Sequence, residues 1–345
     1  MEKKTILVTG AGSNCVINTI KSLKTTGKYR IVATDINPYS IGSFRSDTGY
    51  LVPKEGRDDL FITKLLEICN KENVSLLIPG FDTEIPYIFK SKNRFEKNGV
   101  KVLIGNELLI KIGWDKYKLI KYLKENDFPY LESFEIHESE NALKQLKFPL
   151  VIKPKSGWGQ RGYHLINTYD EFQYILTTLE KDSDNYMIQE YVDEQEGEFT
   201  NSVSVALDGD ILGCICMKRE LVKGSSIRIT IDEFPEVKTQ MIEIAHNIGS
   251  SGPINIQCRL RNGKAMVFEI NSRFSTTNVV RAACGYNEVE ILVDNFITGN
   301  KMFINKYQKK IAMAYLEYAL VKPDQIKYFT EQGSTSAKAE INNWL

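Results

Sequence analysis

The residues with the clearest capacity for chemistry are Lys153 and the glycine-rich segment that follows it. Lys153 ends the apolar run Pro149–Lys153, which is typical of a buried strand, and residues 156–162 (SGWGQRG) contain three glycines. Glycines allow backbone N–H groups to approach phosphate oxygens, and a lysine supplies a fixed positive charge. The segment matches neither the Walker A motif nor the kinase glycine loop. It therefore predicts phosphate binding, with a surface turn that carries an exposed lysine as the alternative.

A second set of polar residues lies on two strands that the sequence predicts to form a hairpin. Asn255 and Gln257 alternate on the first strand, Glu269 and Asn271 alternate on the second, and an Asn-Gly turn separates them. Side chains two residues apart share one face of a strand, so pairing brings all four together. A carboxylate with amide oxygens suits Mg²⁺, and Arg273 could bridge an anionic substrate or a phosphoryl group. The alternative is a hairpin with a polar outer face.

A third set follows the predicted strand Tyr186–Tyr191. The segment Gln189–Val192 ends this strand, and Glu198 opens the next one. A link between two lobes can offer backbone groups to an adenine edge, and a carboxylate can accept a hydrogen bond from a ribose hydroxyl. Because glutamate is common everywhere, this set alone is of low specificity.

Near the N-terminus, a Gly10-Ala11-Gly12 turn follows the first predicted strand, and Asp35 ends the second. Together they resemble part of the dinucleotide-binding fingerprint. Cys15 stands where the third glycine would be, so the close approach of helix to strand is not encoded. The alternatives are an NAD-dependent oxidoreductase or, as the favoured interpretation, a tight turn without a cofactor.

The elements that must position these residues fall into two patterns. The first 105 residues alternate short β-branched runs with amphipathic stretches, which predicts a small α/β domain with a parallel sheet. Later segments contain further predicted strands and helices, for which we expect an α+β arrangement. The predicted strands are 5–9, 30–34, 76–78, 100–104, 149–153, 162–166, 186–191, 200–207, 211–218, 255–260 and 265–270. The predicted helices are 16–23, 60–69, 114–126, 169–179, 235–249 and 288–297.

Composition excludes several other classes of protein. The 345 residues carry 44 Lys and Arg against 44 Asp and Glu, so the chain has no general attraction for nucleic acid or anionic membranes. No apolar run reaches the length of a membrane span or of a signal-peptide core, so we expect a cytosolic protein. The three scattered histidines argue against a histidine metal site, and the six cysteines are expected to be small core residues.

The order and spacing of these motifs resemble the ATP-grasp superfamily, especially the branch similar to the carbamoyl phosphate synthase large subunit and the carboxylate-amine ligases. The resemblance covers about residues 5 to 300 and implies a Rossmann-like N-terminal domain followed by a two-lobed ATP-grasp fold. The segments that carry it are Asp115-Lys116, Phe128-Pro129, 148–154 (FPLVIKP), 156–162, 188–192 (IQEYV), 252–257 (GPINIQ) and 268–273 (FEINSR).

The resemblance also implies roles for individual residues. Residues expected to contact ATP are Lys116, Lys153, Ser156, Gly157, Gly159, Arg161 and Gly162 at the phosphates, Glu190, Tyr191 and Val192 at the adenine, and Glu198 at the ribose. Residues expected to hold Mg²⁺ or Mn²⁺ are Gln257, Glu269 and Asn271, and the catalytic set is Arg273, Lys153 and Asn271. Two positions depart from the pattern: Ser272 replaces a common proline, and residues 274–278 match no acceptor motif.

The implied reaction is phosphorylation of a small carboxylate by MgATP, followed by attack of an amine on the acyl phosphate. A carbamoyl phosphate-forming or kinase-like enzyme is the alternative within the superfamily. Arg273, Ser275, Thr276 and Arg281 are expected to face the acceptor pocket, and the two arginines favour an anionic acceptor such as an amino acid. We expect domains at 1–112, 113–190, 191–303 and 304–345, the last completing a lid or a homodimer contact.

Overall fold

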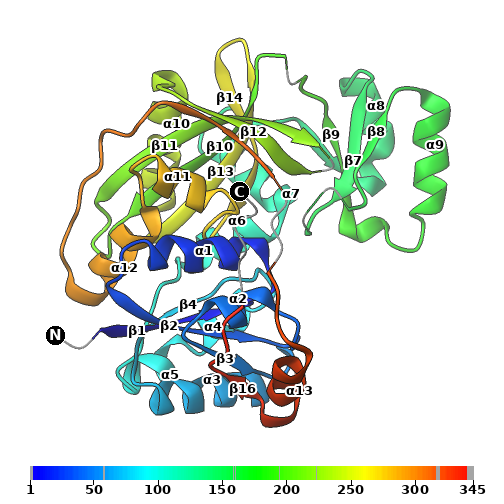
Figure 1. Cartoon of the computed structure of the whole chain (residues 1–345). Helices are drawn as coiled ribbons and strands as arrows, with labels where there is room; N and C mark the ends of the chain where they lie inside the picture. Colours follow the sequence, from blue (N-terminus) through cyan, green and yellow to red (C-terminus); the bar gives the residue numbers. More distant parts are fainter. Residues whose placement is uncertain are drawn as a thin grey trace.

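The N-terminal part of the chain folds around a six-stranded sheet, and two further sheets complete the molecule (Figure 1). The computed structural model describes residues 3–56, 59–157, 159, 161–193, 195–222, 224–315 and 319–339. Within these residues, the three sheets correspond to the predicted Rossmann-like domain and the two lobes of an ATP-grasp fold.

The N-terminal sheet has the order β16-β3-β2-β1-β4-β5, and its strands β1 to β5 run parallel. The chain moves outward from β1 to β3 and then returns to the other side of β1. The crevice outside the carboxyl ends of β1 and β4 is therefore the place where such sheets bind ligands. The elements are β1 (Lys4–Thr9), α1 (Asn14–Lys24), β2 (Tyr29–Asp35), α2 (Ile41–Arg45), β3 (Thr48–Leu51), α3 (Leu60–Lys71), β4 (Val74–Ile78), α4 (Ile85–Lys90), α5 (Lys92–Lys97) and β5 (Lys101–Val102).

The large lobe is an antiparallel sheet in the order β14-β13-β10-β11-β12-β15. One hydrophobic core joins its strands β10 and β13 to α6, α7 and α10. A second core joins the lobe and α12 to β1, β2 and α1, so the N-terminal domain and the large lobe share buried apolar side chains. The elements are α6 (Glu107–Trp114), α7 (Lys116–Glu125), β10 (Glu198–Val205), β11 (Ile211–Val222), β12 (Ser225–Ile231), α10 (Pro235–Ile248), β13 (Gly252–Arg261), β14 (Lys264–Asn271), α11 (Asn278–Ala283), α12 (Glu288–Thr298) and β15 (Lys310–Met313).

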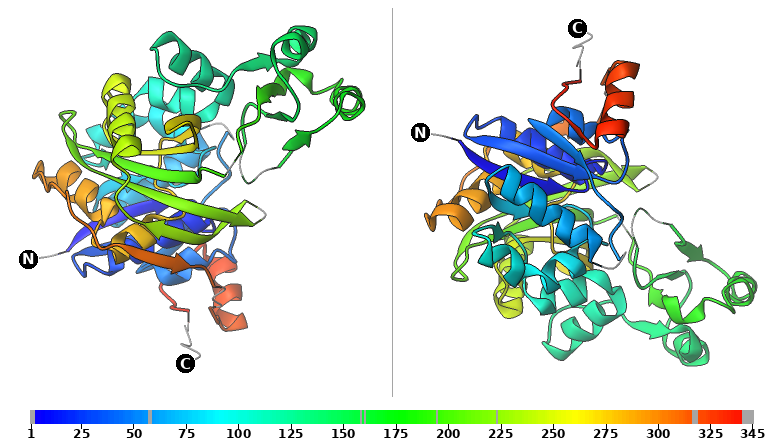
Figure 2. Two further views of the ribbon diagram at one scale, coloured as in Figure 1. Left: turned by 90° about the horizontal axis from the view of Figure 1, so that it is seen from above. Right: turned by 90° about the horizontal axis from the view of Figure 1, so that it is seen from below.

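The small lobe is a four-stranded sheet that stands apart from the rest of the molecule in all three ribbon views (Figures 1 and 2). It has its own core around Phe134, Leu150, Phe172 and Ile188. Its elements are β6 (Ser133–Glu135), α8 (Ser139–Gln145), β7 (Leu150–Pro154), β8 (His164–Ile166), α9 (Tyr169–Thr178) and β9 (Tyr186–Glu190), with short 3₁₀ turns at Ile136–Glu138 and Ser183–Asn185.

The structure places two segments differently from the division expected at 113–190 and 304–345. Helix α7 contributes Leu119, Ile120 and Leu123 to the core of the large lobe, because its apolar face packs mainly beside β14. The tail from residue 304 supplies β15 to the large sheet. It then returns to the N-terminal domain, where α13 (Pro323–Gln332) and β16 (Ser334–Thr335) pack against β3 (Figure 1). In the described residues, the tail therefore joins two existing sheets.

Candidate active site

All three parts of the fold line one cleft of about 840 Å³. The small lobe contributes the end of β7 and the glycine loop, the large lobe contributes β10, β11, β13 and β14, and the N-terminal domain contributes the start of α1 and the loop after β4. The predicted phosphate, metal and acceptor residues thus lie mostly around a single space. The phosphate end of the cleft is the part lined by Lys116, Lys153 and the glycine loop, and the acceptor end is the part lined by Arg273, Ser275 and Thr276.

Lys153 is the buried cation of the phosphate end. Its side chain is 8% exposed, and its Nζ lies 5.7 Å from the centre of the Phe268 ring. Among the described residues, no carboxylate lies within ion-pair distance of it. Burial, followed by the nearby charge of Lys116, lowers the pKa of Lys153 to about 7. A bound phosphate would supply the missing negative charge, so this environment suits an anionic ligand.

Lys116 and the glycine loop form the rim above Lys153. Lys116 begins α7, whose N-terminus is capped by the Asp115 carboxylate, and its Nζ donates to the carbonyl oxygen of Gly157 at 2.9 Å. Gly157 and Gly159 have positive φ angles of 122° and 70° with open space around them, so their backbone is accessible. Ser156, Gly157, Gly159 and Arg161 line the cleft, whereas Gly162 is not among the residues around it. Trp158 and Gln160 of the predicted loop lie outside the described residues.

Glu269 is the carboxylate of the predicted metal site. The two strands form the predicted hairpin, and its register places Asn255 opposite Asn271 and Gln257 opposite Glu269. The amides of Gln257 and Asn271 donate to Glu269 Oε1 at 3.3 and 3.1 Å, and Lys116 Nζ lies 3.9 Å from Oε2. Burial would raise the pKa of Glu269, but the charge of Lys116 and the hydrogen bond from Asn271, together with the other nearby cations, outweigh it, so the pKa is lowered. Glu269 is therefore ionised and directed into the cleft.

This donor set fits a divalent cation that prefers oxygen ligands. It combines one carboxylate with two amides, each of which carries one carbonyl oxygen. The Gln257 oxygen accepts a hydrogen bond from Arg219 at 2.6 Å, so ligation by Gln257 requires its amide to turn. Asn271 is buried beside Glu269 and is not among the residues that line the cleft.

At the hinge, Glu190 is already held by protein groups. Its carboxylate accepts from Arg261 at 2.6 and 3.2 Å and from the backbone N–H of Glu132 at 2.8 Å. To accept a hydrogen bond from the adenine amino group as expected, Glu190 would have to use the lone pairs that these donors leave free. Tyr191 and Val192 line the cleft as expected, and the Val192 carbonyl accepts from Arg259 at 2.7 Å.

Glu198, the expected ribose ligand, lies between two arginines that the sequence analysis missed. Arg219 and Arg259 are its direct partners on β11 and β13, and their guanidinium groups bond to its two oxygens at 2.8 and 2.9 Å. Both arginines line the cleft. Arg259 lies two residues after Gln257, so the period of two could have identified it as a residue of the same face.

At the acceptor end, Arg273 reaches across to the N-terminal domain. Its Nε and one terminal nitrogen donate to the two oxygens of Asp82 at 3.0 and 2.9 Å. Ser275 and Thr276 line the cleft beside it, as predicted. Asp82 was not predicted, and nothing in its local sequence marks it, because the contact joins residues 191 positions apart. Residues of the N-terminal domain that line this end are Gly12, Ser13, Asn14, Cys15, Gly80, Phe81 and Asp82.

Two expectations about buried residues require correction here. Arg281 does not face the cleft: it is fully buried, pairs with Glu288 at 2.7 Å, and donates to the Asn255 side-chain oxygen at 3.0 Å. It supports the wall of the cleft from behind because helix α11 turns its side chain towards β13. Cys15 is only partly buried and lines the acceptor end, whereas the other five cysteines are buried core residues.

The Gly10-Ala11-Gly12 turn is packed in a way that differs from a dinucleotide site. The Gly12 N–H donates to the Asp35 carboxylate at 2.5 Å, so this carboxylate is folded onto the turn. A Cβ at Gly10 would lie 2.8 Å from Phe81 Cβ, and Gly42 donates its N–H to the Ala11 carbonyl at 3.1 Å. Gly10 and Ala11 are thus packed against protein groups, whereas Gly12 is exposed and lines the cleft.

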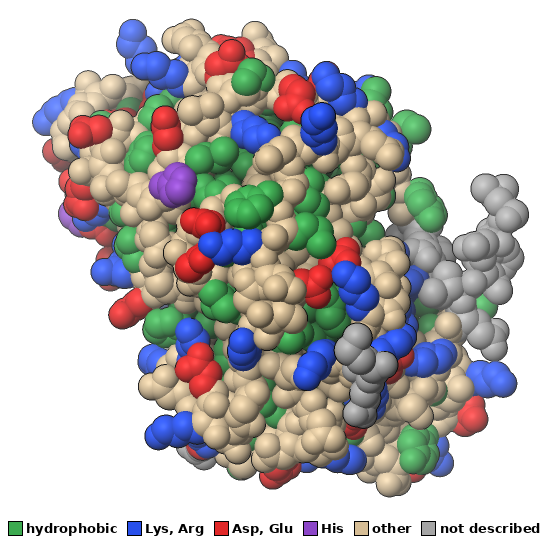
Figure 3. Space-filling model, turned by 90° about the vertical axis from the view of Figure 1, so that its left-hand side faces the viewer, with side chains coloured by type: hydrophobic (Ala, Val, Ile, Leu, Met, Phe, Trp, Pro, Cys, Tyr) green, Lys and Arg blue, Asp and Glu red, His purple; other side chains and the backbone are tan. Residues whose placement is uncertain are grey.

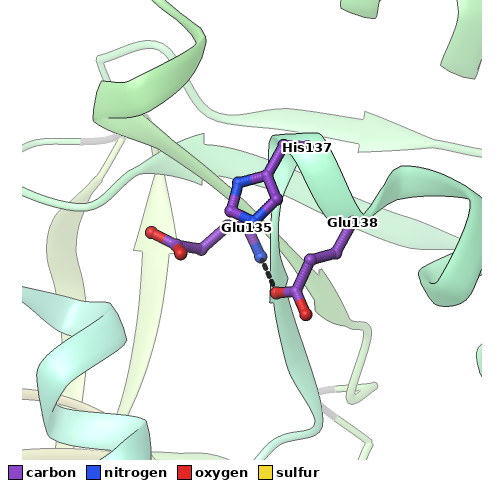
Figure 4. A group of neighbouring side chains, drawn as sticks. All are labelled: Glu135, His137 and Glu138. Atoms are coloured by element: carbon purple, nitrogen blue, oxygen red, sulfur yellow. Dashed lines mark hydrogen bonds between the residues drawn. The ribbon is translucent and has the colours of Figure 1, made fainter.

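A small group outside the cleft, made of Glu135, His137 and Glu138, brings together side chains that could ligate a metal ion (Figure 4). Glu138 accepts from the Glu135 backbone N–H at 3.0 Å, and Glu135 pairs with Lys155. Both carboxylates therefore already have partners: Glu138 within the 3₁₀ turn, and Glu135 in Lys155.

On the face shown in Figure 3, cationic and anionic side chains are interspersed, which agrees with the neutral composition.

The described residues contain no helix with the length and apolar character needed to cross a membrane.

Two family models match the chain. The family described as "PylC-like, N-terminal domain" matches residues 6–103, and the family described as "ATP-grasp domain" matches residues 114–277.

Curated relatives are large chains of carbamoyl phosphate synthase. The one from Pseudothermotoga lettingae is 23% identical over 355 residues, which cover 95% of this chain and 30% of the relative. The one from Archaeoglobus fulgidus is 25% identical over 309 residues, which cover 80% of this chain and 27% of the relative. The chain thus spans less than a third of the length of these relatives.

Solved structures share the fold at low identity. N5-carboxyaminoimidazole synthetase from Staphylococcus aureus, complexed with ADP, superposes with a TM-score of 0.72 at 16% identity, covering 91% of this chain and 83% of that chain. The biotin carboxylase domain of 2-oxoglutarate carboxylase from Hydrogenobacter thermophilus, with MgADP and bicarbonate, gives 0.66 at 13% identity, covering 89% and 72%. Both likenesses extend over the N-terminal domain and the two lobes.

Proposed function

The chain belongs to the ATP-grasp superfamily, in the branch of the carboxylate-amine ligases, and from this premise we propose that it uses MgATP to join a small carboxylate to an amine. The observation that carries the proposal is the meeting of three groups in one cleft. Lys153 is buried without a carboxylate partner among the described residues, Lys116 is directed at the glycine loop, and Glu269 is held ionised between two amides. This arrangement offers positive charge to phosphates and one carboxylate to a metal ion.

In the first step, a carboxylate oxygen of the substrate attacks the γ-phosphorus of ATP and the bond to ADP breaks. In the second, the nitrogen of the amine attacks the carbonyl carbon of the acyl phosphate, and phosphate leaves. Starting from the ammonium form of the amine, one proton leaves with the phosphate and one is released, and an amide remains. Few titrating side chains are needed because positioning and charge neutralisation supply most of the catalysis in phosphoryl transfer.

The roles of the side chains follow from their places in the cleft. Lys153 and Lys116 neutralise phosphate oxygens, and Glu269 with the amides of Gln257 and Asn271 would hold Mg²⁺, which neutralises the charge between the phosphates when bound. Arg273 lies two residues beyond Asn271, and it is placed to contact the transferring phosphoryl group and the acceptor carboxylate.

A direct test measures ADP and phosphate formation across a panel of carboxylates, bicarbonate included, with and without amines. Thermal shift provides the companion measurement, and we expect MgATP to raise the melting temperature while NADH leaves it unchanged. Activity confined to uncharged acceptors, or stabilisation by NADH alone, would overturn the proposal.

Lys153→Ala and Glu269→Ala test the site residues themselves. Each is expected to abolish ADP formation, because Lys153→Ala removes a phosphate contact and Glu269→Ala removes the only carboxylate of the metal set. Glu67→Ala serves as the matched control, since Glu67 is an exposed helix residue paired only with Lys64 among the described residues. Turnover at the parental rate in either site variant would show that the site is assigned wrongly.

A further inference from the structure

The acceptor end of the cleft carries less net positive charge than the sequence suggested, because both arginines expected there have carboxylate partners. Arg281 is neutralised by Glu288 behind the wall, and Arg273 is neutralised by Asp82. The other residues at this end, Ser13, Ser275 and Thr276 among them, carry no charge. Charge selection at this end therefore depends on the Asp82 carboxylate and its arginine.

Asp82 differs from the other carboxylates of the cleft in its location, because among the described residues that line the cleft it is the carboxylate at the acceptor end. Glu190 and Glu198 are bonded to arginines at the hinge, and Glu269 lies at the predicted metal site. Asp82 accepts one hydrogen bond from Arg273 on each oxygen, and its side chain is 23% exposed towards the cleft. Because a carboxylate oxygen has two lone-pair directions, each oxygen of Asp82 retains capacity for a further donor.

The position of Asp82 is fixed by the packing of the loop that carries it. Gly80 follows β4, and a Cβ there would lie 2.1 Å from Val16 Cγ2 and 2.3 Å from the Thr9 carbonyl oxygen. Only glycine lets this segment pack between the end of β1 and helix α1. On the other side, Arg273 donates a further hydrogen bond to the Phe274 carbonyl at 3.1 Å. Both members of the pair are thus held in place before any substrate binds.

We propose that Asp82 is the specificity-determining residue for the amine, and that it selects a nucleophile that arrives as a cation. This inference rests on the proposed ligase function. With an ammonium group beside Asp82 and an acyl phosphate beside Arg273, charges alternate in sign from the phosphoryl group through Arg273 and Asp82 to the amine. The bound ammonium releases one proton to solvent, which frees the nitrogen lone pair for attack, and its second proton leaves with the phosphate. An uncharged nucleophile gains nothing comparable from Asp82, because it lacks the charge that strengthens such hydrogen bonds.

The test compares a cationic and an uncharged nucleophile on Asp82→Asn, which keeps the shape of the side chain and one acceptor for Arg273. Hydroxylamine, largely uncharged at neutral pH, traps the acyl phosphate as a hydroxamate. The cationic probes are ammonium and the proteinogenic amino acids, with amide formation as the readout. The carboxylate is the one that supports phosphate release in the parent. Melting temperatures establish that the variant is folded, and Asp59→Asn, an exposed aspartate of the same domain, is the matched control.

For Asp82→Asn, we expect the ratio kcat/KM for the amine to fall by about 10- to 100-fold, while hydroxamate formation stays within about threefold of the parent. An equal fall with both nucleophiles would overturn the inference, because Asp82 would then act only by orienting Arg273. No change with either nucleophile would also overturn it, because Asp82 would lie outside the acceptor site. A parent that forms no hydroxamate from any carboxylate would instead overturn the proposed function.

Discussion

Two buried cations in this molecule, Arg281 and Lys153, have opposite surroundings. Arg281 is fully buried and has an ion pair with Glu288 together with hydrogen bonds to Thr200 and Asn255. Lys153 is nearly as buried, yet the described residues place no carboxylate within ion-pair distance of it, and its pKa is lowered to about 7. The charge of Arg281 is neutralised within the protein, whereas the environment of Lys153 leaves its charge for a ligand to neutralise.

Lys153 lines the cleft and Arg281 does not, and only the place of Lys153 follows from a local sequence pattern. Lys153 ends an apolar strand before a glycine loop, which is a local pattern. Arg281 lies on a short helix whose direction depends on packing against β13. Residue type alone cannot separate a neutralised arginine from an exposed one, so the distinction needs the partner to be known.

Glu288→Gln should have the largest effect on stability, because it leaves Arg281 buried without a counter-ion. Breaking one partner of a buried pair destabilises a protein by about 3 to 5 kcal/mol. Urea unfolding measures the change, with Glu67→Gln on the exposed pair with Lys64 as a control expected to change stability by less than about 1 kcal/mol. The double variant Arg281→Met/Glu288→Leu should be milder, since both charges leave together. A Glu288→Gln protein as stable as the parent would remove the contrast between the two cations.

Much of the architecture could be predicted from local patterns. The alternation in the first 105 residues predicted the parallel sheet, and the spacing of Asn255, Gln257, Glu269 and Asn271 predicted a hairpin with these residues on common strand faces. Strand β12 was missed because it follows β11 through a short turn and carries exposed polar residues. The place of α13 and β16 could not be predicted, because their contacts with the N-terminal domain join residues nearly 300 positions apart.

Parts of the site depend on pairing across the fold. Arg219 and Arg259 are partners of Glu198 only because β10 lies between β11 and β13. Asp82 meets Arg273 only because the N-terminal domain and the large lobe share one core. Sequence patterns identify groups within one strand or hairpin, and these contacts arise between separate elements.

Lys153→Met removes the buried ammonium group at the cleft and should stabilise the protein at neutral pH. The pKa of Lys153 falls from 10.5 to about 7 on folding, so the folded state disfavours the charged form. The resulting cost is full below about pH 7 and disappears as the pH rises towards 10.5. Replacing the ammonium with an apolar group of similar length should therefore raise the free energy of unfolding by roughly 1 to 3 kcal/mol near pH 7. Thermal unfolding from pH 7 to 10 measures this gain, and a gain that does not shrink with rising pH would contradict the burial of an unpaired charge.

The smallest expected effect is on nucleotide affinity as the pH changes, and it shows how Lys153 responds to a bound phosphate. Bound phosphate should raise the pKa of Lys153, because the opposite charge favours the ammonium form. Below about pH 7 the lysine is already protonated, so affinity should be constant with respect to this group. Above that value, binding must take up a proton, and the dissociation constant of MgATP should rise by up to about tenfold per pH unit. Calorimetric titrations in buffers of different ionisation enthalpy measure the proton uptake directly. Lys153→Met should bind more weakly and lose this uptake, and if the uptake persisted in that variant it would come from a different group.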